Sequence, residues 1–416
     1  MIYYPNKLDT IFDKLKSYGI KPIIVGGYIR DYLAKIESKD IDIEIYGISS
    51  FSELQNILKE FGSVNVVGKS FGVCKLYFEE YDLDFSFPRI DNKVQSGHRG
   101  FEISIDTTLD FETATSRRDF TMNSVGYDVI ERKILDPFGG IKDFENKILK
   151  AVNLESFGED PLRVLRAVQF ATRFELKIED NLFSICKDMV LSGMLNELPK
   201  ERIFEEIKKL LLYAKKPSRG FELLKEFGSG LYTQNISVID EVAKQRTTNN
   251  QTNIVLMLAA LCYNFSQKEA QDFIEKITHE KELLQRSLLL IKKHSEVETL
   301  YENSINDYHL YKLAAEVNIE ELLILSSSIY FANHNSEIYR AGEEIKKRAR
   351  ELNILNKKLP AILMGRDILK FGVEPSPLFS EILNEAYEAQ MHGKFKNYDE
   401  AFLWLREYIS HKASFV

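Results

Sequence analysis

The sequence predicts an α+β protein in which a strand-rich head, residues 1–145, is followed by an extended helical region. Two observations carry this prediction. Up to residue 145, short apolar runs, some alternating at period two, are separated by Gly and Asp turns, which is typical of strands. Beyond residue 146, apolar residues recur at helical spacing and few strand signals remain.

The head is expected to begin with the buried-strand signal Ile23-Ile24-Val25, which leads through Gly26-Gly27 into a helix over 28–36. Strict alternation over 41–45 predicts a second strand. The other elements expected in the head are a helix over 51–61 and strands over 72–78, 81–87 and 101–105. In the remainder, helices are expected over 162–174, 182–191, 200–214, 255–265 and 270–293.

Composition narrows the class of protein. The three cysteines form no Cys-x-x-Cys pair, which argues against a disulfide framework and a cysteine zinc site. The sequence has no secretion signal at its start and no apolar run long enough to span a bilayer, so we expect a cytoplasmic protein without a membrane partner. The net charge of −8 argues against a non-specific nucleic-acid coat, although local basic clusters remain compatible with RNA binding.

Two carboxylates in the second expected strand are the first candidates for chemistry. Asp40 and Asp42 are two apart, so period two places them on one face. Because like charges repel there, a divalent cation between them is favoured, and Mg²⁺ binds carboxylates together with substrate phosphates. A pair of such ions can activate an attacking hydroxyl and stabilise the leaving oxygen. Alone, Asp-x-Asp also describes an ordinary charged strand face.

The surroundings of this pair strengthen the metal interpretation. Glycines at Gly26 and Gly27, between a strand and a helix, let backbone N–H groups approach a phosphate. Arg30 on the following helix could reach a triphosphate. A third carboxylate is offered by Asp82 or Asp84, again two apart, and the residues alone leave that choice open.

Five segments stand in an order that matches the motifs of a known family. They are Gly26-Gly27-Tyr28-Ile29-Arg30-Asp31 running to Asp40-Ile41-Asp42, residues 84–89, residues 117–124, residues 158–167 with Phe170 and Arg173-Phe174, and residues 199–202 with Glu205 and Glu206. Through this ordered set the chain resembles the class II tRNA nucleotidyltransferases and bacterial poly(A) polymerases, best known as CCA-adding enzymes.

The resemblance implies a fold and roles. The fold would be a nucleotidyltransferase head of the polymerase-β type with a mixed sheet, followed by an elongated all-α neck, body and tail. These parts would lie at residues 1–145, 146–212, 213–335 and 336–416. Asp40 and Asp42 would hold Mg²⁺, with Asp84 as the third catalytic carboxylate. The nucleotide-binding residues would be Gly26, Gly27, Arg30, Arg118, Asp119, Asn123, Asp160, Arg163 and Arg166.

Among these residues, Arg118 and Asp119 are expected to contact the ribose, where the 2′-OH distinguishes RNA from DNA. Asp160 and Arg163, three apart on an expected helix, would share one face. A carboxylate accepts from an exocyclic amine and a guanidinium donates to ring acceptors, which suits cytosine and adenine. The pair could also be a simple helix salt bridge, but the flanking matches favour base recognition.

The implied activity is addition of C, C and A to the 3′ end of tRNA from CTP and ATP. The alternatives are a poly(A) polymerase, a partial CC- or A-adding enzyme, and a catalytically silent RNA-binding protein. Some longer relatives carry a His-Asp phosphohydrolase site, but here the matching place reads Leu261-Cys262-Tyr263-Asn264-Phe265, so we expect no phosphohydrolase activity. In the family the loop over 91–101 helps decide when specificity passes from C to A.

Overall fold

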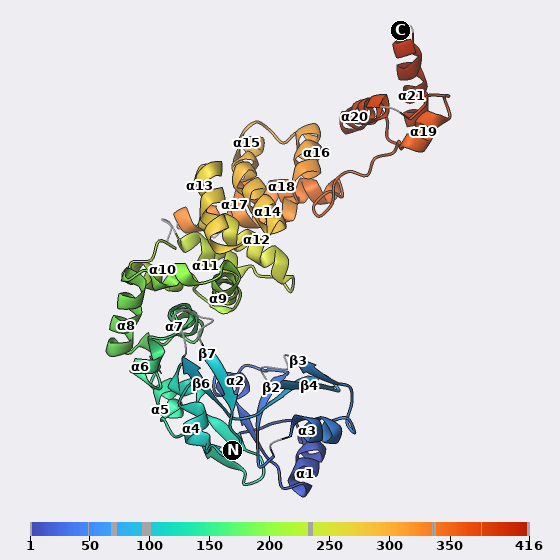
Figure 1. The fold of residues 1–416 in the computed structure, drawn as a ribbon. Helices are drawn as coiled ribbons and strands as arrows, with labels where there is room; N and C mark the ends of the chain where they lie inside the picture. The colour runs from blue at the N-terminus through green and yellow to red at the C-terminus, as the bar shows by residue number, and fades with distance from the viewer. Residues whose placement is uncertain are drawn as a thin grey trace. The chain divides into compact units, whose positions relative to one another are not determined.

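The computed structural model describes residues 2–48, 50–67, 73–93, 101–231, 236–334, 336, 338–375 and 377–413. The chain divides into two compact units, Met1–Tyr232 and Thr233–Val416. Figure 1 shows the strands gathered in the first unit and only helices in the described part of the second. The finer division into neck, body and tail stays a prediction.

The head is built on a seven-stranded mixed sheet with the order β3-β4-β5-β2-β1-β8-β9. Strands β2 and β5 pair in parallel, and the other neighbours in this sheet are antiparallel. The strands are β1 Lys21–Val25, β2 Asp40–Tyr46, β3 Val64–Val67, β4 Val73–Phe78, β5 Tyr81–Ser86, β8 Gly126–Asp128 and β9 Lys133–Leu135. Strand β7 (Phe101–Ile105) lies outside this sheet and pairs with β6 (Arg89–Lys93). The mixed-sheet head is therefore confirmed.

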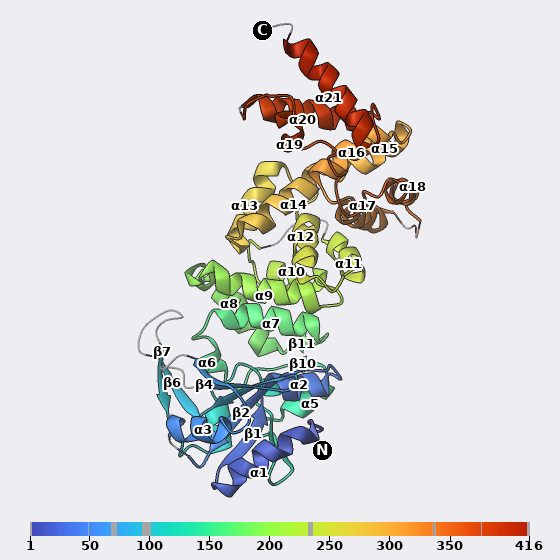
Figure 2. The ribbon, with the colours of Figure 1, turned by 90° about the vertical axis from the view of Figure 1, so that its right-hand side faces the viewer.

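One face of this sheet is covered by α1 (Asp9–Ser17) and α3 (Phe51–Leu58), and the contact forms the core of the head (Figure 2). Ile41 and Ile43 of β2 and Phe85 of β5 are buried in it. Because side chains alternate along a strand, Asp40, Asp42 and Asp84 must face the opposite side of the sheet. The other head helices are α2 Gly27–Leu33, α4 Phe111–Thr115 and α5 Gly140–Glu145.

A helical layer completes the first unit. Its central helices, α7 (Leu162–Arg173) and α9 (Lys200–Tyr213), pack closely against each other. Gly220 allows α10 to approach them, since a Cβ there would lie 2.7 Å from Leu210 and 3.0 Å from Thr172. The remaining helices of this layer are α6 Leu154–Phe157, α8 Asp180–Leu191 and α10 Ser218–Glu226, and the short pair β10 Ile148–Leu149 and β11 Lys177–Ile178 ties its start to the head.

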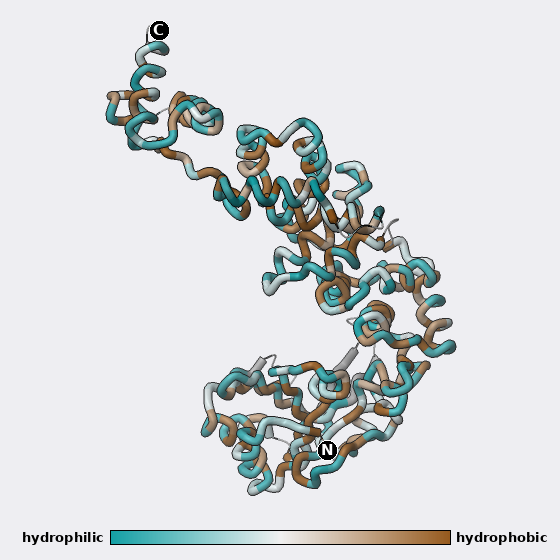
Figure 3. The backbone as a smooth tube through the Cα atoms, turned by 180° about the vertical axis from the view of Figure 1, so that it is seen from behind, coloured by the Kyte–Doolittle hydropathy of each residue, from teal (hydrophilic) through white to brown (hydrophobic). Residues whose placement is uncertain are grey.

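Helices are the regular secondary structure of the second unit in its described residues. Its apolar helix α12 is buried from Asn253 to its end, and hydrophobic stretches gather where the helices pack (Figure 3). A separate small core joins α19, α20 and α21. The helices are α11 Ser237–Lys244, α12 Asn250–Leu261, α13 Gln267–Ile277, α14 Lys281–Lys293, α15 Glu296–Glu302, α16 Asp307–Glu316, α17 Ile319–Asn333, α18 Arg340–Glu351, α19 Gly365–Leu369, α20 Pro377–Met391 and α21 Tyr398–Ala413.

One expected helix was wrong in its extent. The stretch 270–293 forms two helices, α13 and α14, separated at Thr278. Thr278 has an extended backbone and is buried, and its hydroxyl accepts the N–H of Glu280 at 3.2 Å. A β-branched residue that bonds its local backbone competes with the helix. None of the helices in the described ranges is long and apolar enough to serve as a membrane span.

Candidate active site

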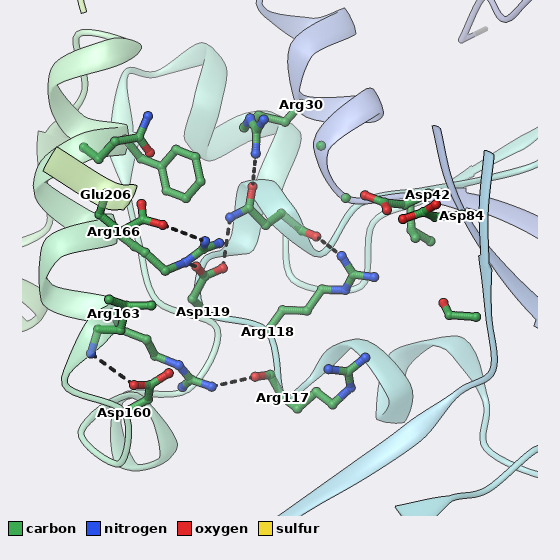
Figure 4. Close-up of a pocket in the computed structure, with 18 of the residues that line it drawn as sticks. Arg30, Asp42, Asp84, Arg117, Arg118, Asp119, Asp160, Arg163, Arg166 and Glu206 are labelled. Atoms are coloured by element: carbon green, nitrogen blue, oxygen red, sulfur yellow. Dashed lines mark hydrogen bonds and ion pairs between the residues drawn. The ribbon is translucent and has the colours of Figure 1, made fainter. Parts of the chain in front are cut away.

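A pocket of about 650 Å³ lies between the open face of the head sheet and helices α7 and α9, within the first unit (Figure 4). All of the residues predicted for catalysis or nucleotide binding line this pocket, except the exposed Asp40. Those that line it are Gly26, Gly27, Arg30, Asp42, Asp84, Arg118, Asp119, Asn123, Asp160, Arg163 and Arg166. The structure thus brings together residues from five separated segments of the sequence.

The strand wall of the pocket carries the carboxylates. The parallel register of β2 and β5 sets Asp40 opposite Asp82 and Asp42 opposite Asp84. Of these four, Asp42 and Asp84 line the pocket, whereas Asp40 and Asp82 lie two residues nearer the start of each strand. The pocket therefore favours Asp84 over Asp82 as the third carboxylate. Asp84 accepts a hydrogen bond from the exposed Lys75 ammonium at 2.8 Å.

Asp42 faces the open pocket, yet protein surrounds most of its volume. This desolvation raises the pKa of the Asp42 carboxyl above its ordinary value, and the negative charges of Asp84 and Asp40 add to the rise. The charge of Arg118 and the backbone N–H of Gly27, which donates to Asp42, oppose it. The nearby positive groups therefore do not fully compensate the negative charge of Asp42.

The glycine turn before α2 is shaped by its close approach to this carboxylate. Gly26 has a φ of 68°, in the left-handed region that favours glycine. A Cβ at Gly26 would lie 3.1 Å from Arg118 Nη1 and 3.3 Å from Asp42 Oδ2. A side chain at position 26 would therefore strain the turn and push it away from Asp42.

Asn123 links three of the expected nucleotide-binding residues. Its side-chain oxygen accepts a hydrogen bond from Arg30 at 3.2 Å, and its backbone oxygen accepts one from Arg118 at 3.0 Å. Its side-chain nitrogen donates to Asp119 at 2.9 Å. Arg30 is buried, also donates to Asp31 at 2.7 and 2.9 Å, and lies over the Phe170 ring at 4.9 Å. Arg30 is thus held within the wall of the pocket.

Asp119 forms a buried ion pair with Arg166, whose Nε lies 2.6 Å from Asp119 Oδ2. Burial alone would raise the pKa of the Asp119 carboxyl. The charge of Arg166 and the hydrogen bond from Asn123 outweigh burial, so the pKa is lowered and the group stays ionised. Arg118 reaches toward the fully buried Glu44, with Nη2 and Oε2 3.6 Å apart.

The placement of Asp160 corrects one expectation. Helix α7 begins at Leu162, so Asp160 precedes the helix instead of lying on it three residues from Arg163. Pro161 cannot donate a backbone N–H and starts helices readily, so the preceding carboxylate accepts the N–H of Leu162 at 3.0 Å. No ion pair between Asp160 and Arg163 occurs in the described structure; Asp160 lies 3.5 Å from Arg202 instead.

Arg163 still shares the pocket with Asp160, and its guanidinium is fixed by two backbone oxygens. It donates to Ser156 O at 2.9 Å and to Arg117 O at 2.8 Å. Residues three or four apart on α7 face the pocket together.

Several residues that line the pocket were not predicted as site residues. Polar residues at helical spacing along α7 and α9 were the signal that could have identified them. They include Gln169, Arg173, Arg202, Glu206 and Lys209.

Two expectations fall partly outside this description. The loop over 91–101 lies mostly in residues 94–100, outside the described residues, as does Gly72 at the start of the strand expected over 72–78.

Among the residues that are described, no group of three or more His, Cys, Asp or Glu side chains is placed to hold a metal ion. Mg²⁺ commonly uses one or two protein carboxylates and completes its shell with phosphates and water. The pair Asp42 and Asp84 fits that donor set.

Three family models match the chain in order. They are the "Poly A polymerase head domain" over 23–150, the "Probable RNA and SrmB- binding site of polymerase A" over 175–231, and "tRNA nucleotidyltransferase domain 2" over 247–405. Among solved structures, the Bacillus stearothermophilus CCA-adding enzyme in complex with CTP matches with a TM-score of 0.71, 20% identity and 100% of both chains. The Thermotoga maritima CCA-adding enzyme complexed with tRNA matches with a TM-score of 0.64, 18% identity and 98% and 97% of the two chains. These similarities confirm the fold.

Curated relatives match about half of the chain. The "Multifunctional CCA protein" of Neisseria gonorrhoeae (strain NCCP11945) is 34% identical over 206 residues, 50% of this chain and 48% of that protein. The protein of the same name from Xylella fastidiosa (strain 9a5c) is 32% identical over 197 residues, 47% and 45% of the two chains. The chain thus spans about half the length of these relatives. The three domain models lie in order along the chain, and with these relatives they make it similar to the tRNA nucleotidyltransferases and poly(A) polymerases.

Proposed function

We propose that the chain adds C, C and A to the 3′ end of tRNA, using CTP and ATP and no nucleic-acid template. In each step the 3′-hydroxyl of the RNA would attack the α-phosphate of the nucleotide, and pyrophosphate would leave. One observation carries the proposal: a single pocket holds Asp42 and Asp84 next to a glycine turn and opposite Asp160 and Arg163. The names of the matched relatives support it.

Similarity to this family implies the use of a divalent metal, and we propose Mg²⁺ held by Asp40 and Asp42, with Asp84 as the third carboxylate. All three lie on one face of the sheet. Such an ion lowers the barrier by activating the attacking hydroxyl and neutralising the leaving oxygen. The raised pKa of Asp42 supports the assignment, because a site short of positive charge gains most from a cation.

The wall beside the carboxylates is proposed to bind the triphosphate and the ribose. Gly26 and Gly27 would allow close approach of phosphate, while Arg30 would stabilise this wall through Asp31 and Asn123. Asp119 stays ionised and accepts from Phe120 N, Asn123 and Arg166. A carboxylate has about four acceptor positions, so one remains for a ribose hydroxyl.

Base selection is proposed to lie at the start of α7. Asp160 would accept from the exocyclic amine of cytosine or adenine, and Arg163 would donate to the neighbouring ring nitrogen. Guanine and uracil present a carbonyl oxygen where the amine would be, which a carboxylate cannot accept from. The backbone contacts of Arg163 support this role because they fix its guanidinium before a nucleotide arrives.

The test is an extension assay with purified protein, Mg²⁺ and tRNA that lacks its last three nucleotides. CTP alone should add two residues, and ATP should add one only after them. Continued addition of A would instead indicate the poly(A) polymerase, and arrest after CC or addition of A alone would indicate a partial enzyme. Binding of RNA without any extension would leave a silent RNA-binding protein. We further propose a cytoplasmic location and no phosphohydrolase activity.

A further inference from the structure

Glu44 is the third carboxylate in the alternating series of strand β2. It lies two residues beyond Asp42, so the two side chains project from the same face of the sheet. Glu44 lines the pocket but is only 1% exposed. A buried carboxylate is costly unless charged or hydrogen-bonding partners stabilise it. The partners of Glu44 therefore indicate its role.

The Glu44 carboxylate is fixed by one neighbour and holds another. Tyr46 donates its hydroxyl to Glu44 Oε1, and Arg118 Nη2 lies 3.6 Å from Glu44 Oε2. The other end nitrogen of Arg118, Nη1, donates to the backbone oxygen of Asn123 at 3.0 Å. The guanidinium is therefore held at both of its end nitrogens, by a carboxylate at one and a carbonyl oxygen at the other.

Asp42 is a second carboxylate within reach of this guanidinium. Arg118 Nη1 and Asp42 Oδ2 lie 3.1 and 3.3 Å from the same point, the place of a Cβ at Gly26. In Figure 4 the Arg118 side chain extends toward the Asp42 side of the pocket. Burial raises the pKa of Asp42, and among the groups that oppose this rise the charge of Arg118 is the strongest.

The two side chains nevertheless stay apart, since in the described part of the chain no ion pair joins Arg118 to Asp42. Elsewhere in the pocket an arginine does close a carboxylate, because Arg166 lies 2.6 Å from Asp119. Opposite charges attract strongly where water is partly excluded. Without its contact to Glu44, the Arg118 guanidinium would therefore be drawn onto Asp42.

We propose that Glu44 is a positioning residue, which holds the Arg118 guanidinium off Asp42 and so keeps an Asp42 oxygen open for the divalent cation. The inference rests on the proposed function, because it takes Asp42 as a metal ligand. Arg118 held in this way reduces the negative charge around Asp42 without occupying the oxygen that the cation needs.

The test measures Mn²⁺ binding to the purified full chain by electron paramagnetic resonance, without nucleotide or RNA. Glu44→Gln keeps the shape of the side chain and removes its charge, which releases Arg118 toward Asp42. The dissociation constant for Mn²⁺ should rise by roughly 5- to 10-fold more in the wild-type background than in Arg118→Met, where no guanidinium is left to release. A mere loss of negative charge would weaken binding equally in both backgrounds.

The matched control is Asp82→Asn, which removes a carboxylate from the same face of the sheet but outside the pocket. Its effect on Mn²⁺ binding should be the same with and without the Arg118 side chain. If Glu44→Gln does not fold, Glu44→Asp keeps the charge, shortens the reach to Arg118 and should show a smaller loss that again depends on Arg118.

Equal losses in the two backgrounds, or unchanged or tighter Mn²⁺ binding by Glu44→Gln, would overturn the inference. So would a wild type that extends RNA but binds no Mn²⁺ on its own, because Asp42 would then not be open to a cation. A wild type that neither binds Mn²⁺ nor extends RNA would instead overturn the proposed function.

Discussion

The strand wall and the helix wall of the pocket differ in how their charges are compensated. On the strand wall, Asp42 keeps a raised pKa because burial and neighbouring carboxylates outweigh its positive contacts. On the helix wall, acidic groups have basic partners, as in Asp119 with Arg166 and Asp160 with Arg202. The strand wall is thus prepared to receive a cation, and the helix wall is held in place before a ligand arrives.

The largest expected effect comes from removing charge on the strand wall. Asp42→Asn should lower kcat for nucleotide addition by roughly 1,000-fold or more, because it withdraws both a metal ligand and transition-state charge stabilisation. The measurement is single-turnover extension of tRNA. Asp82→Asn is the matched control, since Asp82 is on the same face of β5 but outside the pocket. An equal loss of kcat in the two variants would contradict a specific catalytic role for Asp42.

On the helix wall, the same kind of change should cost stability. Asp119→Asn leaves Arg166 without its carboxylate and should lower the free energy of unfolding by about 2–3 kcal/mol. Because the pKa of Asp119 is lowered, its contribution is present above pH 3.8 and is lost as pH falls through the lowered pKa. In urea unfolding, the difference between the variant and the wild type should therefore be larger at pH 7 than at pH 3.

A suitable control for this stability effect is Asp180→Asn, which removes an exposed ion pair with Lys177. Exposed pairs contribute little, so unfolding should hardly change. A similar destabilisation in both variants would mean that burial of the Asp119 pair is not what matters.

Base choice should be separable from turnover. Asp160→Ala removes the amine acceptor, and should lower the discrimination of CTP and ATP against UTP and GTP by roughly 10- to 100-fold, the value of one good base contact. Its kcat with the correct nucleotide should fall much less than that of Asp42→Asn. The measurement is the rate of misincorporation with each of the four nucleotides supplied separately. An equal loss of activity with all four nucleotides would contradict the role of Asp160 in base selection.

The smallest effect has the opposite sign from that of Asp119. Since the pKa of Asp42 is raised, its contribution to stability is full below pH 3.8 and is lost as pH rises through the raised pKa. Asp42→Asn should therefore stabilise the metal-free protein at pH 7, by about 0.5–1 kcal/mol because solvent screens the group. Thermal unfolding should show a small rise in Tm. Added MgCl₂ should stabilise the wild type and reverse this order.

Local patterns predicted the parts of the site that lie on one strand or helix. Period two was enough to place Asp40 and Asp42 on one face. The register that sets Asp84 beside Asp42 could not be read, because parallel pairing joins strands that are distant in sequence. The network through Asn123 depends on packing between segments, which no spacing encodes.

Two differences arise where one residue changes the backbone bonding. The start of α7 at Leu162 was predicted, but Pro161 keeps Asp160 off the helix on which its pairing with Arg163 was expected. Thr278 divides the helix expected over 270–293 into α13 and α14. The polar stretch over 247–253 has the composition of a loop, yet α12 begins within it at Asn250. Asn249 caps α12 by accepting the N–H groups of Gln251 and Thr252, so a run that resembles a loop contains a helix start.

The side-by-side parallel strands β2 and β5 have one more consequence. A slip of a single residue between them would turn Asp84 into the apolar interior and bring Phe85 out beside Asp42. Because successive side chains of a strand point to opposite faces, there is no intermediate register with partial function. A misfolded head would be inert, however compact, so any active molecule in a preparation reports a correctly paired sheet.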